Sequence, residues 1–226
     1  MEVSKRNLYI GCFASLILCI FYICILDYYT FPSGDEIGTA DSAINWVTNG
    51  EWYSAVWVYT YHPLHNFLLT LWISVFGVSH QAVCSMNVVI AFIVSLLCLK
   101  ILSERKITNS LFSVLLFVFL FWAIAPHSNG RIDCLMLLFS LGIADQLIPS
   151  SENRKKNNKL LAFYSFGLMF TGIYSLPILL VLGIALLIYA RKDVEKRNVL
   201  ITQAKIIVLF CFISFVIICI FFLNTS

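Results

Sequence analysis

The sequence predicts an all-α integral membrane protein with about seven transmembrane helices and a long first outer loop. Apolar residues make up 60% of the 226 residues and charged residues only 12%, whereas a soluble domain carries about 25% charge. The mean hydropathy is +0.89. The apolar residues form uncharged runs, several of them long enough to cross the roughly 30 Å hydrocarbon core of a bilayer. This composition excludes a disordered tail, a collagen and a nucleic-acid-binding module, so we expect no nucleic-acid partner.

The first predicted span is residues 7–26, which follow Lys5 and Arg6. The run is long for a signal peptide, and no small-x-small cleavage site precedes Asp27, so we expect an uncleaved anchor. Residues 160–190 carry no charge, and as one helix they would measure about 46 Å. Gly172 and Pro177 interrupt this run, which predicts a hairpin of two short helices. The six later spans are expected at 81–102, 108–126, 132–149, 160–173, 175–190 and 206–223.

The short apolar run 64–78 decides the predicted orientation of the chain. If it does not cross the bilayer, 14 of the 15 basic residues fall on one side and only Arg131 falls on the other. The positive-inside rule favours this arrangement. We therefore expect a cytoplasmic N-terminus, an outer C-terminus and 64–78 lying in the outer interface. The outer loop 27–79 would carry a second interface helix at about 35–48, with acids in its first turn and Asn49-Gly50 at its end.

The eight cysteines lie within or beside the apolar runs and form no C-x-x-C pair. They are therefore interpreted as small apolar packing residues and not as a disulfide framework. The long outer loop contains no Asn-x-Ser/Thr sequon. This favours a bacterial inner membrane as the location of the multi-pass protein, with its active face outside.

Polar side chains of two outer loops are the candidate functional residues. The first loop offers Asp35, Glu36 and His62, and the second offers Arg131 and Asp133. Carboxylates beside a membrane groove can act as a general base or hold a divalent cation. An arginine can grip a phosphate in bidentate fashion. The set suits a substrate with a phosphate head and a lipid tail.

The order of these motifs resembles the GT-C class of polytopic glycosyltransferases. The similar branch contains dolichyl-phosphate-mannose protein mannosyltransferases and bacterial aminoarabinose transferases. The resemblance covers about residues 1–190. Its elements are an acidic pair, an amphipathic helix, a Gly-acid-Trp turn, a His-Pro-Leu element, a Phe-Gly helix end and a later Asp. In this sequence they are Asp35-Glu36, the helix to about Val47, Gly50-Glu51-Trp52, His62-Pro63-Leu64, Phe76-Gly77 and Asp133.

The resemblance implies a role for each candidate residue. Asp35 would be the principal catalytic acid-base residue, Glu36 would assist it, and Asp133 would be the second acid. Arg131 and His62 would face the donor phosphate, and Asp35 and Asp133 would hold a divalent metal if one is used. The implied reaction transfers a sugar from a polyprenyl-phosphate donor to a glycan, lipid or protein acceptor.

The sequence departs from the family pattern at three places. Leu64 replaces the second proline of a Pro-Pro pair, Cys84 and Ser85 stand where a basic residue is frequent, and the turn at 171–174 lacks a lysine. Family members also extend well beyond this shared module. A minimal enzyme, a subunit that needs a partner and a truncated remnant all remain open.

Each candidate residue also has a purely structural interpretation. Asp35 and Glu36 could be first-turn acids of an interface helix, Asp133 could mark a helix end, and Arg131 could anchor to lipid headgroups. Asp145 lies within a predicted span near its inner end, and functional and structural roles are equally open for it. The alternative function is a non-catalytic membrane subunit, or a lipid-carrier translocation or assembly factor in cell-envelope polysaccharide synthesis.

Overall fold

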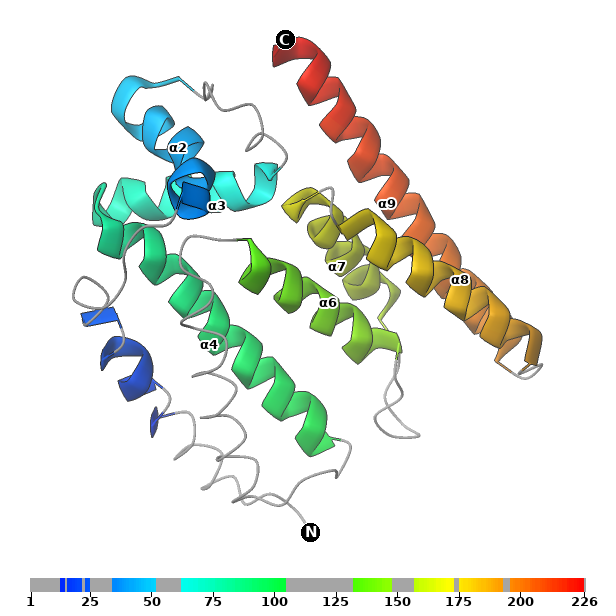
Figure 1. Ribbon diagram of the computed structural model, residues 1–226. Coiled ribbons are helices and arrows are strands. Elements are labelled where there is room, and N and C mark those ends of the chain that lie inside the picture. The colour runs from blue at the N-terminus through cyan, green and yellow to red at the C-terminus, as the bar shows by residue number, and fades with distance from the viewer. Residues whose placement is uncertain are drawn as a thin grey trace.

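The computed structural model describes residues 13–14, 16–21, 23–24, 34–51, 62–104, 132–147, 157–172, 175–192 and 196–225. Its secondary structure is helical throughout this part of the chain, with no strand, which confirms the all-α prediction (Figure 1). The expected span at 108–126 and part of 7–26 lie outside the described residues. The helices are α2 (Gly34–Asn49), α3 (Pro63–Phe76), α4 (His80–Glu104), α6 (Asp133–Leu147), α7 (Asn158–Thr171), α8 (Leu176–Lys192) and α9 (Arg197–Thr225).

Glycines end the two helices that occupy the long predicted loop. Helix α2 ends at Asn49, and Gly50 follows with φ +72° and donates its N–H to the Trp46 carbonyl at 3.0 Å. Helix α3 begins with Pro63, where the absent N–H costs no hydrogen bond. It ends before Gly77, which has φ +86°. Glycine adopts these backbone angles without the strain that a Cβ would cause.

Helix α3 exposes apolar groups and buries a mixed face. Its buried residues are polar His65, Asn66 and Thr70 together with apolar Leu69 and Ile73. Its opposite face exposes large apolar side chains, among them Leu71 at 51% and Val75 at 76%. A surface helix in water exposes polar residues instead. The face of α3 that the rest of the described chain does not cover is therefore suited to contact with lipid.

Two of the described helices are long and apolar enough to cross a membrane. These segments are His80–Leu102 in α4 and Arg197–Ile220 in α9. Helix α9 begins nine residues before the expected start of the last span at 206. The reason is that Arg197 and Lys205 have good helix propensity, so the helix continues beyond the apolar run into the basic segment.

Glycines and aromatic rings bring α6 and α7 together. The Tyr164 ring of α7 lies against Gly142 of α6, and the Phe139 ring of α6 lies against Gly167 of α7. The exchange is reciprocal, because each helix supplies one ring and one glycine that receives a ring. A Cβ on either glycine would overlap the opposite ring. The absence of a side chain therefore sets the close approach of these two helices.

Helices α7 and α8 are separated within the uncharged run 160–190. Helix α7 ends at Thr171, and α8 begins at Leu176. Buried Ser175 stands between them, and its hydroxyl lies 2.9 Å from the Leu168 carbonyl and 2.5 Å from the Gly172 carbonyl. One side chain thereby offers a donor to carbonyls at the end of α7, which lack partners within the helix.

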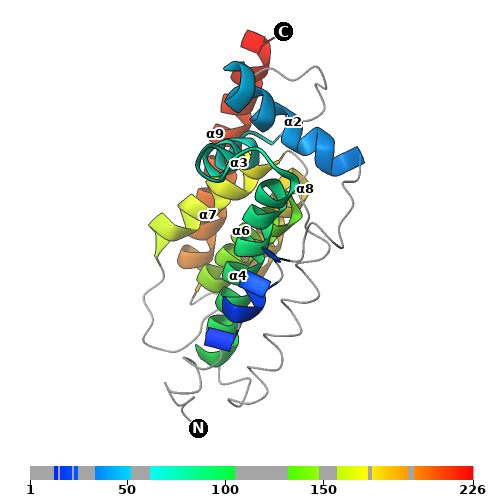
Figure 2. The ribbon, with the colours of Figure 1, turned by 90° about the vertical axis from the view of Figure 1, so that its left-hand side faces the viewer.

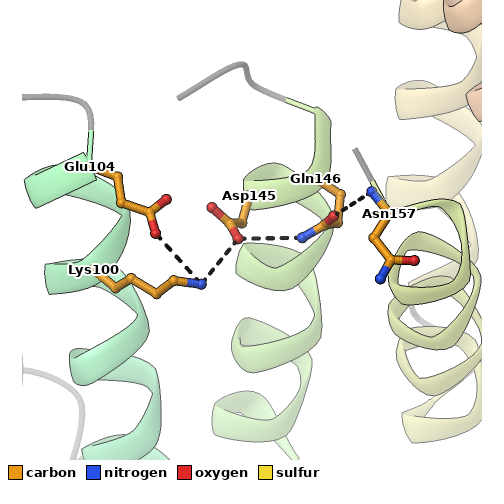
Figure 3. A network of polar contacts seen from close by, with 5 residues as sticks. All are labelled: Lys100, Glu104, Asp145, Gln146 and Asn157. Carbon is orange, nitrogen blue, oxygen red and sulfur yellow. Dashed lines mark hydrogen bonds and ion pairs between the residues drawn. The ribbon is translucent and has the colours of Figure 1, made fainter. Parts of the chain in front are cut away.

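A polar network joins the ends of α4 and α6 that lie away from α3 (Figures 1 and 3). Lys100 Nζ of α4 lies 3.7 Å from Asp145 Oδ2 of α6 and 3.9 Å from Glu104 Oε1. Gln146 Nε2 donates to Asp145 Oδ2 at 3.4 Å, and Gln146 Oε1 accepts from the Asn157 backbone N–H at 3.4 Å. Asp145 thus lies in an ion pair between helices. The buried carboxylate is accounted for by a structural role.

Candidate functional site

Three segments meet at the end of the bundle that carries α3. His62 precedes α3, Gly172 follows α7, and Ile132 precedes α6. A methyl group placed on Gly172 would lie 2.8 Å from His62 Nδ1 and 3.4 Å from Ile132 Cδ1. The glycine thus lets an imidazole and an isoleucine pack against the end of α7. The residue before α3 and the residue before α6 therefore come together at this point.

The imidazole of His62 is held by the backbone of α7. Its Nδ1 lies 3.2 Å from the Thr171 carbonyl oxygen, and the residue is only 7% exposed. A carbonyl oxygen only accepts hydrogen bonds, so Nδ1 carries the proton in this contact. The ring is therefore fixed to α7. Any contact of His62 with a donor phosphate would fall to Nε2.

The predicted acids are placed only in part. Asp35 and Glu36 belong to the first turn of α2, and their side chains lie outside the described residues. Helix α2 packs on α3, and its Ala40, Ser42 and Ala43 are buried. The acidic pair therefore lies on α2, and α2 contacts α3, the helix that begins directly after His62. Figure 2 shows α2 lying across α3.

The second predicted loop is also placed in part. Asp133 is the first residue of α6 and is exposed. A carboxylate in this position is favoured by the positive end of the helix dipole. Arg131 lies outside the described residues. The structure thus brings Ile132 to His62 but gives no distance between the predicted acids.

The sequence interpretation missed a buried polar cluster beside His62. It consists of His65 and Asn66 on α3 and Asn87 on α4, all at most 3% exposed. Among the described residues, neither ring nitrogen of His65 has a hydrogen-bond partner of full geometry. Burial of the ring, and then the neighbouring His62, lower the pKa of His65 from 6.5 to about 4. The nearby Asn66 and Asn87 side chains act in the opposite direction and raise this pKa, but their effect is smaller. His65 is therefore neutral at pH 7.

Two signals in the sequence could have revealed this cluster. Asn87 is an amide inside an otherwise apolar predicted span, where polar groups need partners. His65 follows His62 by three residues, with Pro63 between them. The structure makes His62 the residue before the helix and places His65 in its first turn. The two rings are then near enough for an electrostatic effect.

The described residues give no direct support to a metal centre. No group of three or more His, Cys, Asp or Glu side chains within them could hold an ion. The predicted pair Asp35 and Asp133 includes one side chain outside the described part. The cation therefore remains an expectation from the sequence.

A cavity of about 390 Å³ lies beside α3 and α4. Its polar wall includes Trp72, Gln81 and Ser85. The Trp72 indole N–H donates to Ser85 Oγ at 3.0 Å, and Gln81 Nε2 donates to the Ile23 carbonyl at 2.8 Å. Neither His62 nor Asp133, the predicted site residues whose side chains the structure describes, lines this cavity. We therefore assign its polar groups to joining α3, α4 and the segment around Ile23.

Comparison with known proteins gives no independent assignment. No family model matches the chain, and neither a curated protein nor a solved structure shows significant similarity to it.

Proposed function

We propose that this chain is a multi-pass membrane protein of a bacterial inner membrane that transfers a sugar from a polyprenyl-phosphate donor at its outer face. Seven spans and a cytoplasmic N-terminus are part of the proposal. The observation that carries the site is the packing of His62, Ile132 and Gly172 at one end of the bundle. His62 is one of the predicted site residues, and Ile132 stands between two others, Arg131 and Asp133, in the sequence.

The distribution of polar groups supports the membrane part of the proposal. Helix α8 exposes Val181, Ile184 and Ile188, while its buried positions include Gly183 and Ala190. Helix α9 exposes Phe212 at 63% and buries Gln203 and Ser214. Small and polar residues inside with large apolar residues outside are the pattern of helices packed in lipid. In water, such a surface would be a large apolar patch.

The proposed chemistry assigns one task to each predicted residue. Asp35 accepts the proton of the acceptor hydroxyl as it attacks the anomeric carbon, and the bond to the phosphate oxygen breaks. Arg131 stabilises the charge of the departing polyprenyl phosphate, and so does His62 Nε2–H when the imidazole carries a proton on both ring nitrogens. Glu36 and Asp133 complete the acidic surroundings. A divalent cation held by Asp35 and Asp133 would supply further charge stabilisation at the phosphate.

The test is transfer of radiolabelled sugar from a polyprenyl-phosphate donor pool into membrane acceptors. Purified wild type is compared with Asp35→Asn and Asp133→Asn at equal amounts. Asp41→Asn is the matched control, because Asp41 lies on the same helix but outside the predicted acid pair. We expect transfer by wild type and Asp41→Asn, and a loss of at least a hundredfold in Asp35→Asn, the size typical of a missing acid-base group.

Two outcomes contradict the proposal. If folded wild type transfers no label, the non-catalytic subunit or assembly factor becomes the better interpretation. If all three Asn variants lose activity equally, the acids act through structure and Asp35 is not the base. Elution as a single species in size-exclusion chromatography checks that each variant is folded.

A further inference from the structure

An apolar groove runs between α8 and α9. Its larger part has a volume of about 510 Å³ and is lined by Leu187, Ala204, Lys205, Val208, Leu209 and Phe212. A second part of about 180 Å³ shares Val208 and Phe212 with it and extends to Leu176 and Phe215. From Lys205 to Phe215 the groove covers about 15 Å of helix. This length is half of the roughly 30 Å hydrocarbon thickness, or one leaflet.

The groove follows from the sizes of the side chains on the two helices. Gly183 of α8 lies close to Val208 of α9, with 3.5 Å between the valine and the position of an added Cβ. Ala190 and Ala204 are also small and buried. Large side chains flank this strip, including Leu209 at 54% and Phe212 at 63% exposure. The resulting channel is apolar and open on its outer side.

Among the described residues, Lys205 is the single charged one that lines the groove, and it lies at one end. In the described part of the chain, no carboxylate forms an ion pair with its exposed ammonium group. The segment 191–205 holds five basic and two acidic residues. A lysine stem can lie along apolar surface while its ammonium group reaches the headgroup level. Basic pockets between membrane helices on the cytoplasmic side bind anionic lipid heads.

We propose that this groove binds one anionic glycerophospholipid of the cytoplasmic leaflet. Its phosphate lies at Lys205, and an acyl chain follows the groove past Val208 and Phe212. The apolar length fits a chain of one leaflet, and the charge at its end fits an anionic head. The proposal needs α9 to cross the membrane with its basic end in the cytoplasm. It does not depend on sugar transfer.

The experiment measures lipid binding to the purified full chain by native mass spectrometry. The probes are dioleoyl-phosphatidylglycerol and dioleoyl-phosphatidylcholine, added separately to protein in detergent. We expect wild type to prefer phosphatidylglycerol. Lys205→Leu should weaken phosphatidylglycerol binding about fivefold, the effect of one lysine near the headgroups. Lys159→Leu is the matched control, because Lys159 is an exposed basic residue at the start of α7 and does not line the groove.

A second variant tests the shape of the groove separately from its charge. Leu209→Trp fills the channel and should weaken binding of both lipids. Equal loss in Lys205→Leu and Lys159→Leu would overturn the proposal, because it would mean diffuse surface attraction. Equal affinity of wild type for both lipids would also overturn it. The proposal would also be overturned if wild type forms dimers that Leu209→Trp dissociates, because a second copy of the chain would then cover the groove.

Discussion

Acidification should destabilise this protein through the buried ring of His65. The pKa of His65 is about 4 in the folded chain and 6.5 when unperturbed. Above pH 6.5 the ring is neutral in both states. Between pH 6.5 and about 4 the unfolded chain binds a proton that the native chain does not, so the free energy of unfolding falls as the pH falls. Below about 4 this contribution falls no further.

The two pKa values give the size of the effect. Lowering the pH from 7 to 5 should remove about 2 kcal/mol of stability, and the complete loss is about 3 kcal/mol. For a chain of this length, 2 kcal/mol corresponds to a fall of about 4–8 °C in the unfolding midpoint. The cause is the full burial of the ring together with the neighbouring His62. Both would be absent in the unfolded chain.

The assay heats purified protein in detergent at pH 7 and at pH 5, and then measures the monodisperse fraction by size-exclusion chromatography. His65→Leu removes the titrating ring at similar volume, so its fall in midpoint should be smaller than that of wild type by about 4–8 °C. His80→Gln is the control, because His80 lies at the start of α4 and is only partly buried. Acidic side chains titrate alike in every variant and cancel from the comparison. If His65→Leu keeps the full acid sensitivity of wild type, the assignment to His65 is wrong.

Three further predictions concern helix packing and the candidate site. Lys100→Met should lower the free energy of unfolding by about 1–3 kcal/mol, because Asp145 stays buried but loses its ion pair with Lys100. Thermal unfolding should show that adding Asp145→Leu restores stability. No recovery in the double variant would contradict the pairing. Gly167→Ala should cost about 1–3 kcal/mol through overlap with the Phe139 ring. Combination with Phe139→Leu should restore the unfolding midpoint, whereas unchanged stability of the single variant would disprove the close approach. Gly172→Ala should displace the His62 ring, so the rate of sugar transfer should fall while the unfolding midpoint changes little. A fall of both together would indicate a folding defect alone.

The sequence predicted the helical fold because the hydrophobic signal is local. An apolar run of 20 residues forms a helix whatever its neighbours are, since its backbone groups need internal partners. Gly50 likewise marks a helix end in the sequence and in the structure. The interruption of the run 160–190 followed from Gly172 and Pro177 alone. Its details did not, because the hydroxyl of Ser175 also bonds to the Leu168 carbonyl, seven residues earlier in the chain.

The candidate site was predicted less completely for a related reason. His62, Arg131 and Asp133 stood out as polar residues in loops. Nothing local predicts that His62 would be held by the Thr171 carbonyl, 109 residues later in the chain. The cluster of His65, Asn66 and Asn87 was missed because a polar residue on an apolar helix has no preferred side until a partner helix is present.

Composition and charge by themselves thus determined the helical class of this chain, its apolar runs and the polar loops between them. Only the tertiary structure decided which polar groups are buried together and which helices touch. It paired Lys100 with Asp145, set two aromatic rings against two glycines, and buried three polar side chains of α3. The physical reason is the range of the forces involved. Helix formation depends on residues a few positions apart, whereas burial and pairing depend on contacts between segments distant in the sequence.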